Sequence, residues 1–123
     1  MKIGIDFHGV LDTDPRFFAE FSKAIIVAGG EVHIITGAKR SMVESDLKTW
    51  DISYTHFFSI VESVNEDEVR WEDAENPWVD AEVWNRRKAK YCKEHEIDLH
   101  LDDTSEYLLH FKTPCARFYS KDK

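Results

Sequence analysis

Residues 2–15 read KIGIDFHGVLDTDP, and this stretch decides how the rest of the chain is interpreted. A short apolar run ends on Asp6, as expected for a buried strand that stops at a carboxylate. Glycine and polar residues follow, and then Asp14 and Pro15. This pair is typical of a helix start, because aspartate caps the first turn and proline suits the first helical position. The stretch therefore predicts a strand, a polar turn and a helix in direct succession.

The alternation of strand and helix continues along the chain. Apolar or alternating runs predict further strands at 31–36, 56–61, 97–103 and 116–120, and amphipathic runs predict helices at 14–28, 41–50, 81–95 and 105–111. The second helix is expected to begin at a capping box from Ser41 to Glu44. The expected fold is α/β, a three-layer Rossmann-like parallel sheet of about five strands with helices on both faces. The length predicts a single domain over residues 1–123.

The charge of the chain is concentrated in one segment. The net charge is −8, and residues 62–82 hold nine acids and one base, while the rest of the chain holds 15 of each sign. This balance argues against a partner that is bound through a nucleic-acid backbone. No apolar run approaches the ~20 residues of a membrane span. With no leader ahead of Lys2, we expect a cytoplasmic protein with no membrane contact, in which Cys92 and Cys115 are reduced.

Polar residues stand at the ends of the predicted strands, where parallel α/β sheets bind ligands. These ends carry Asp6, the pair Thr36-Gly37, residues 59–62 and the pair Asp102-Asp103. Acids at two strand ends would repel each other without a cation, and oxygen ligands of this kind suit Mg²⁺. Thr36-Gly37 offers a hydroxyl and backbone N–H groups for a phosphoryl oxygen. Lys88, which precedes the acidic pair, can neutralise both carboxylate and phosphate. The set predicts phosphoryl transfer.

Four motifs in this order resemble those of the haloacid dehalogenase superfamily of Mg²⁺-dependent phosphohydrolases. They read DFHGVLD at 6–12, VHIITG at 32–37, RRKAKYC at 86–92 and LHLDDTSEY at 99–107. Each is weak alone, but their order and their places at the ends of predicted elements make the resemblance specific. It implies a haloacid dehalogenase-like phosphatase, a phosphoric monoester hydrolase.

The resemblance also implies a role for each matching residue. Asp6 would be the nucleophile that forms an aspartyl-phosphate. Thr36 and Lys88 would hold the phosphoryl group, with Gly9 and Gly37 in the substrate site. Lys90 competes with Lys88 for the position of the motif lysine, and the sequence leaves this open. The metal would be held by Asp6, the backbone carbonyl of His8 and Asp103, with Asp102 behind them as a supporting group.

His8 is a departure from the family pattern, because most phosphatases of the family have an acid/base aspartate there. Histidine can act as acid and base near neutral pH, but family members that lack the aspartate often hold the phosphoenzyme longer. The alternative hypothesis is therefore a non-catalytic or very slow module that binds phosphate and Mg²⁺. A receiver-like signalling module has the same residue types, but its acidic pair follows the first strand, whereas here the pair follows the fourth. The order of the motifs therefore disfavours this class.

The acidic residues 63–80 are expected to be an irregular loop or a minimal cap inserted in the domain. Trp78 and Trp84 beside it could stack a base or sugar ring, so the expected partner is a small phosphorylated substrate such as a nucleotide or sugar phosphate. The sequence leaves the oligomeric state undetermined, since a protein without a cap can close its site by forming an oligomer. Asp12 is interpreted as a structural hydrogen-bond acceptor in the loop or as a group that supports the site from behind. The remaining histidines show no ligand spacing and are interpreted as structural; they are His33, His56, His95, His100 and His110.

Overall fold

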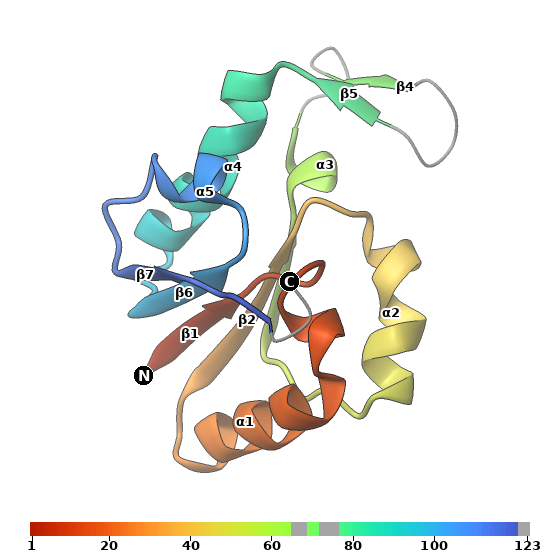
Figure 1. Cartoon of the computed structure of the whole chain (residues 1–123), viewed down its shortest axis with the longest axis vertical. Coiled ribbons are helices and arrows are strands. Elements are labelled where there is room, and N and C mark those ends of the chain that lie inside the picture. Colours follow the sequence, from red (N-terminus) through yellow and green to blue (C-terminus); the bar gives the residue numbers. More distant parts are fainter. Residues whose placement is uncertain (65–68, 72–76, 121–123) are drawn as a thin grey trace.

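The computed structural model describes residues 1–64, 69–71 and 77–120. Its main sheet has five strands in the order β3-β2-β1-β6-β7, and every pairing in it is parallel (Figure 1). The strands are β1 (Lys2–Ile5), β2 (Glu31–Thr36), β3 (His56–Ser59), β6 (Leu99–Asp102) and β7 (Cys115–Arg117). The predicted α/β architecture with a parallel sheet of about five strands is thus confirmed.

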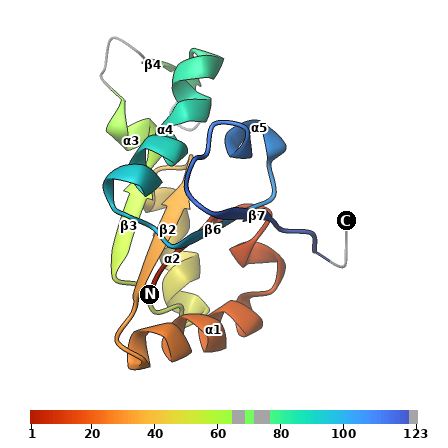
Figure 2. The same cartoon turned by 90° about the vertical axis from the view of Figure 1, so that its left-hand side faces the viewer.

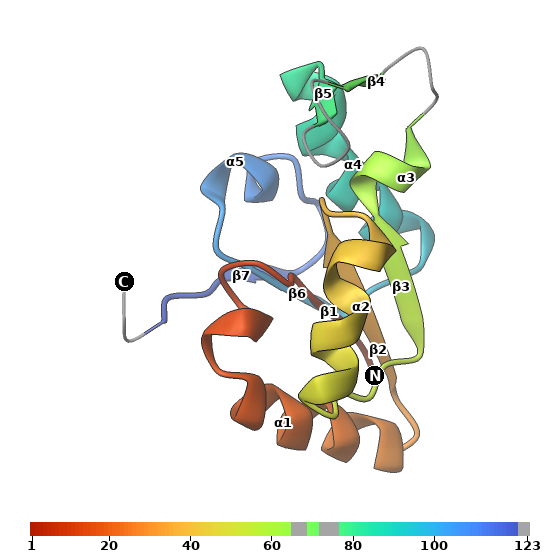
Figure 3. The same cartoon turned by 90° about the vertical axis from the view of Figure 1, so that its right-hand side faces the viewer.

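Helices cover both faces of this sheet (Figures 2 and 3). One face packs against α1 (Pro15–Val27) and α2 (Arg40–Thr49), and the other against α4 (Ala81–Glu94), beside which lies α5 (Ser105–Leu108). Alternate residues of β2 serve the two sides: Ile34 joins the core under α1 and α2, whereas Ile35 packs with Tyr91 and Cys92 of α4. A strand buried on both faces needs a nearly continuous apolar run, as the sequence of β2 provides.

The strand order reverses direction between β1 and β6. From β1 the chain builds outward through β2 and β3 on one side, and it then returns to place β6 on the other side of β1. The crevice at such a reversal is where doubly wound sheets bind their ligands, because the flanking loops diverge there. Asp6 follows β1 directly and Asp102 ends β6, so the fold brings both to this crevice.

The helix starts follow local rules in one case and tertiary contacts in another. The Asp14 side chain accepts a hydrogen bond from the Phe17 amide at 3.2 Å, as the Asp-Pro pair predicts. The predicted capping box at 41–44 is wrong: α2 begins at Arg40, and its N-cap residue, Lys39, makes no side-chain cap. The Arg40 amide instead donates to Glu62 Oε1 at 3.1 Å, so a distant carboxylate satisfies the helix end.

The acidic segment is more regular than predicted. The third strand ends at Ser59, whose side chain caps the short helix α3 (Ile60–Ser63). Beyond it, β4 (Val69–Trp71) and β5 (Pro77–Val79) form a separate antiparallel pair, which corrects the expectation of an irregular loop (Figure 1). The predictions of a minimal cap and of a stacking role for Trp78 depend on residues and on a side chain that lie outside the described part of the chain. No helix in the described ranges is long and apolar enough to cross a membrane.

Candidate active site

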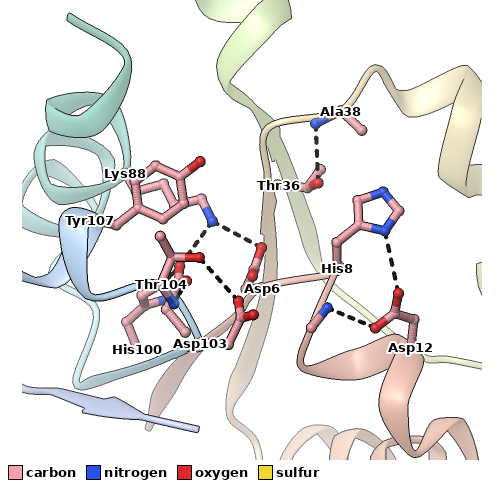
Figure 4. A network of polar contacts seen from close by, with 12 residues as sticks. Asp6, His8, Asp12, Thr36, Ala38, Lys88, His100, Asp103, Thr104 and Tyr107 are labelled. Atoms are coloured by element: carbon pink, nitrogen blue, oxygen red, sulfur yellow. Dashed lines mark hydrogen bonds and ion pairs between the residues drawn. The ribbon is translucent and has the colours of Figure 1, made fainter. Parts of the chain in front are cut away.

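A lysine and two carboxylates meet in the crevice between β1 and β6. Lys88 Nζ lies 2.9 Å from Asp6 Oδ1 and 2.9 Å from Asp102 Oδ2. Lys88 comes from the middle of α4, one face of which is buried against the sheet. Its ammonium also lies 4.2 Å from the centre of the Tyr107 ring (Figure 4). The side chains of Lys88 and Asp102 are at most 1% exposed, so water does not screen this group.

The charges of this cluster do not balance. Burial raises the pKa of Asp6 to about 8; the Lys88 ammonium opposes this rise, and the Asp102 charge adds to it. Burial works against the charge of Lys88, but Asp6 and Asp102 together raise the pKa of its ammonium. Although Asp102 is buried, hydrogen bonds from His100 and Lys88 lower its pKa. Asp102 is therefore ionised at neutral pH. The protonation of Asp6 instead depends on pH and on any further positive charge nearby.

Asp103 completes an acidic group that could hold a metal ion. One oxygen from each of Asp6, Asp102 and Asp103 lies within 4.8 Å of the others. The Asp103 carboxylate also accepts from Thr104 Oγ1 at 3.3 Å. It sits against the backbone of Gly9, where a Cβ atom would overlap it. Because Gly9 also has a φ of +88°, glycine is required there both for the loop conformation and for the approach of Asp103.

The loop after β1 is fixed by its own hydrogen bonds. The carbonyls of Asp6 and Phe7 accept from the amides of Leu11 and Asp12 at 3.2 and 3.1 Å. The Asp12 carboxylate accepts from the Gly9 amide at 2.8 Å, which confirms the interpretation of Asp12 as a structural acceptor. This loop therefore presents Asp6 and the following residues in one defined conformation.

His8 lies at the outer side of this loop. Its Nδ1 is 3.3 Å from Asp12 Oδ2, and its side chain is 63% exposed (Figure 4). The ring stands on the Asp12 side of the loop, whereas Lys88 and Asp103 lie on the other side of Asp6. Asp12 thus orients the imidazole through one ring nitrogen, and the other ring nitrogen is left to face the crevice or solvent.

Thr36 and Gly37 form the opposite wall. Thr36 is 1% exposed, and its Oγ1 accepts from the Ala38 amide at 3.2 Å. A hydroxyl that accepts in this way still has its own proton to donate. Gly37 is packed against the indole of Trp84, since a Cβ on Gly37 would lie 2.6 Å from Trp84 Cζ2. The turn after β2 therefore brings a hydroxyl donor and an aromatic surface to the same place.

A cavity of about 470 Å³ joins these groups. Trp84 and Tyr107 form one side of it and are linked by a hydrogen bond of 2.7 Å from the indole N–H to the phenol oxygen. The predicted site residues that line this cavity are Asp6, His8, Gly9, Thr36, Gly37, Lys88 and Asp103. Its other lining residues are Ala38, Lys39, Met42, Val61, Trp84, Thr104 and Tyr107. A pocket of this size and composition suits a small ligand with one charged and one flat apolar end.

The structure separates the two lysines that the sequence left open. Lys88 reaches Asp6, whereas Lys90 is 64% exposed and pairs loosely with Glu94 at 3.9 Å. Tyr107 and His100 belong to the site although no sequence pattern predicted a role for them. His100 Nε2 is 2.9 Å from Asp102 Oδ2. His100 and Asp102 are two residues apart on one strand and so share a face. That spacing in the sequence could have predicted the contact between the two side chains.

Comparisons of the chain with protein-family models, with curated proteins and with solved structures gave no match. The function is therefore argued from the geometry of the site and from the sequence motifs.

Proposed function

We propose that this chain is a Mg²⁺-dependent phosphomonoester hydrolase of the haloacid dehalogenase type that acts through Asp6. The observation that carries the proposal is the ion-pair bridge from Lys88 to Asp6 and Asp102 at the reversal point of the sheet. A buried carboxylate beside a lysine, a threonine hydroxyl and a further acid is the donor set that phosphoryl transfer through an aspartate needs.

The residues present fit a divalent metal ion. One carboxylate oxygen from each of Asp6, Asp102 and Asp103 lies within 4.8 Å of the others. The single lysine that bridges Asp6 and Asp102 can offset only one of their charges when both are ionised, which leaves a role for a further cation. Oxygen donors of this kind favour Mg²⁺ over softer metals. Asp6, Asp103 and the carbonyl of His8 would hold the ion, with Asp102 supporting them from behind. When bound, the ion would supply positive charge that keeps Asp6 ionised and neutralises phosphoryl oxygens.

The proposed reaction begins with attack by an Asp6 oxygen on phosphorus, which forms the acyl phosphate while the bond to the leaving oxygen breaks. That oxygen takes a proton, for which His8, in the wall of the cavity, is the candidate acid. Lys88 and the Thr36 hydroxyl hold the phosphoryl oxygens. Water then attacks phosphorus and gives its proton to the neutral His8, and Asp6 and inorganic phosphate are released.

The cavity supports a small phosphorylated substrate. Trp84 and Tyr107 offer a flat apolar wall beside the phosphate position, which suits a nucleotide base or a sugar face. With the charged end held between Lys88 and Thr36, the remainder of the ligand would lie along this wall. We therefore place nucleotides and sugar phosphates first among the compounds to test.

Phosphate release from an aryl phosphate and from a panel of nucleotides and sugar phosphates tests the proposal. We expect release that depends on Mg²⁺, is abolished in Asp6→Asn, and falls by about 100-fold or more in Lys88→Met. Lys90→Met is the matched control on the same helix, and it should keep wild-type activity. Release that persists in Asp6→Asn would contradict the proposed nucleophile.

A second candidate is a module that binds phosphate and Mg²⁺ but turns over very slowly. The observation that favours it is the position of His8, whose ring is exposed and held by Asp12. On this hypothesis His8→Asp should raise phosphate release from near background, while wild-type protein is stabilised by Mg²⁺ with vanadate. If His8→Asp instead lowers a measurable wild-type rate, His8 itself is the acid and base.

The receiver-like alternative conflicts with the strand order. Receiver domains have the order 2-1-3-4-5 with respect to their five sheet strands. Here the five strands of the main sheet run 3-2-1-4-5 when numbered along the chain. The acidic pair also follows β6, not β1.

A further inference from the structure

A second group of metal-binding side chains lies at the opposite end of the sheet. Glu31 and His33 are two residues apart on β2, so they project from one face. His56 is the first residue of β3 and is the register partner of His33. The three side chains therefore meet near the amino ends of two neighbouring strands, which run side by side in Figure 2, whereas the candidate active site lies at the carboxyl ends.

The distances among these three groups are those of a ligand set. His33 Nε2 lies 2.9 Å from Glu31 Oε1, and His56 Nδ1 lies 3.7 Å from the same oxygen. All three ligand atoms are within 4.8 Å of one another. Tetrahedral Zn²⁺ with ligands at about 2.0–2.1 Å requires ligand atoms roughly 3.3 Å apart. The His33–Glu31 distance is shorter than this spacing and the His56–Glu31 distance is longer, so side chains have to move for all three atoms to reach one ion.

The buried histidine already has the partner that a ligating imidazole needs. His33 is 1% exposed, and its Nδ1 lies 2.6 Å from the Tyr91 hydroxyl of α4. Histidines that bind metal through one nitrogen usually hydrogen-bond through the other, which fixes the ring and its tautomer. Because Nδ1 of His33 contacts the Tyr91 hydroxyl, its other ring nitrogen, Nε2, faces Glu31.

A metal ion would take the place of the hydrogen bond between His33 and Glu31. To bind the ion, His33 Nε2 has to present its lone pair, so the ring proton has to lie on Nδ1, where the Tyr91 hydroxyl oxygen can accept it.

Of the three side chains, that of His56 is the one that has to rotate. Its ring stacks on that of His33 with centroids 4.1 Å apart and planes 3° apart. Two parallel rings cannot both aim a lone pair at one ion, so His56 has to turn. Its side chain is 45% exposed and contacts Glu31 and Thr55 through Nδ1, so there is space for this rotation.

We propose that Glu31, His33 and His56 form a Zn²⁺-binding site, distinct from the candidate active site, with water in the fourth position. Two imidazoles and one carboxylate are a donor set found in zinc sites that keep an open position. Imidazole nitrogen selects Zn²⁺ and related transition metals over Mg²⁺. Bound there, the ion pins β2 to β3 at the end of the sheet remote from the reaction.

Calorimetric titration of the metal-free full-length chain with Zn²⁺, in excess Mg²⁺, tests the proposal. We expect one Zn²⁺ per chain and about 100-fold or greater weakening in His56→Ala and in Glu31→Gln. Tyr91→Phe should weaken binding by about 10-fold without removing a ligand, as loss of an outer partner does. His110→Ala is the matched control because His110 lies outside the cluster. Co²⁺ should give the visible spectrum of a tetrahedral nitrogen and oxygen site in wild type and in His110→Ala, but not in His56→Ala.

The acidic group near Asp6 is the competing Zn²⁺ site, and Asp103→Asn separates the two. Binding that survives Asp103→Asn and is lost in His56→Ala supports the proposal. Binding that is unchanged in His56→Ala, or that is lost in Asp103→Asn, overturns it, as does the absence of binding to a folded wild-type chain. Because these readouts measure Zn²⁺ and not phosphate release, the result is independent of the function proposed for Asp6.

Discussion

Lys88 Nζ stands at equal distance, 2.9 Å, from a carboxylate oxygen of Asp6 and one of Asp102. These three groups come from the ends of two adjacent strands and from the middle of the helix that packs across them. One ammonium therefore holds together two buried acids that would otherwise repel each other. This relationship links the stability of the fold to the chemistry proposed for the site.

Lys88→Met should destabilise the chain by about 3–5 kcal/mol at pH 8.5, because it leaves two buried carboxylates without their cation. The loss should be smaller at pH 5.5, where Asp6 can take up a proton, as burial raises its pKa to about 8. Urea unfolding in EDTA at both pH values measures this difference. Lys90→Met, on the exposed face of α4, should change the free energy of unfolding by less than about 0.5 kcal/mol. Equal losses in the two variants would argue against the bridge.

Asp6→Asn should stabilise the metal-free chain at high pH. The pKa of Asp6 is raised from 3.8 to about 8 by folding, so the folded state binds more protons than the unfolded state. Stability contributed by this group is present below pH 3.8 and is lost as pH rises toward 8. Asparagine carries no charge at any pH, so the variant should unfold at higher temperature than wild type at pH 8.5 in EDTA.

Added Mg²⁺ should make wild type more stable than Asp6→Asn. The ion is expected to raise the melting temperature of wild type more than that of Asp6→Asn, because it binds the carboxylate. Differential scanning fluorimetry with and without Mg²⁺ gives both comparisons. A wild type that is more stable than Asp6→Asn in EDTA at pH 8.5 would show that the pKa of Asp6 is not raised.

Gly9→Ala and Gly29→Ala form a matched pair. Both glycines have a φ of +88°, so alanine at either position should cost about 1–2 kcal/mol in backbone strain. A Cβ on Gly29 meets no atom within 4 Å, whereas one on Gly9 overlaps the Asp103 carboxylate. Gly9→Ala should therefore lose about 1–3 kcal/mol more, and it alone should weaken Mg²⁺ binding. If Gly9→Ala and Gly29→Ala changed the free energy of unfolding and the affinity for Mg²⁺ equally, the Asp103 carboxylate would not lie against Gly9.

His100 should make the chain sensitive to mild acid. Burial lowers its pKa below 6.5, despite its hydrogen bond to Asp102, so the folded state binds fewer protons than the unfolded state. Stability from this group is present above pH 6.5 and is lost as pH falls toward the folded pKa. His100→Gln should reduce this loss, measured as the free energy of unfolding between pH 7.5 and 5. His110→Gln, at a histidine outside this cluster, is the control.

The sequence and the structure agree where local signals and burial point the same way. The Asp14-Pro15 helix start and the parallel sheet followed from short patterns that the tertiary fold preserves. The capping box at 41–44 failed because Glu62, distant in sequence, satisfies the amide of Arg40. The strand pair β4–β5 was missed because the acidic segment has little apolar periodicity.

The histidines also show the difference between what local sequence patterns and the tertiary structure reveal. Their spacing in the sequence gives no ligand pattern, and the structure shows that His33 and His100 are buried in the sheet. What the sequence could not show is that His33 and His56 are register partners, because pairing between strands depends on the whole fold.

The sequence by itself determined the strand that leads into Asp6, the acidic pair at the end of the fourth predicted strand, and the α/β class of the chain. These features rest on periodicity and on residue types next to one another, which local patterns record. Only the tertiary structure decided that Lys88 and not Lys90 reaches Asp6, and that Glu31, His33 and His56 converge. Both outcomes depend on how α4 and β3 pack against β1 and β2, and close packing fixes such contacts between segments that are far apart in the chain.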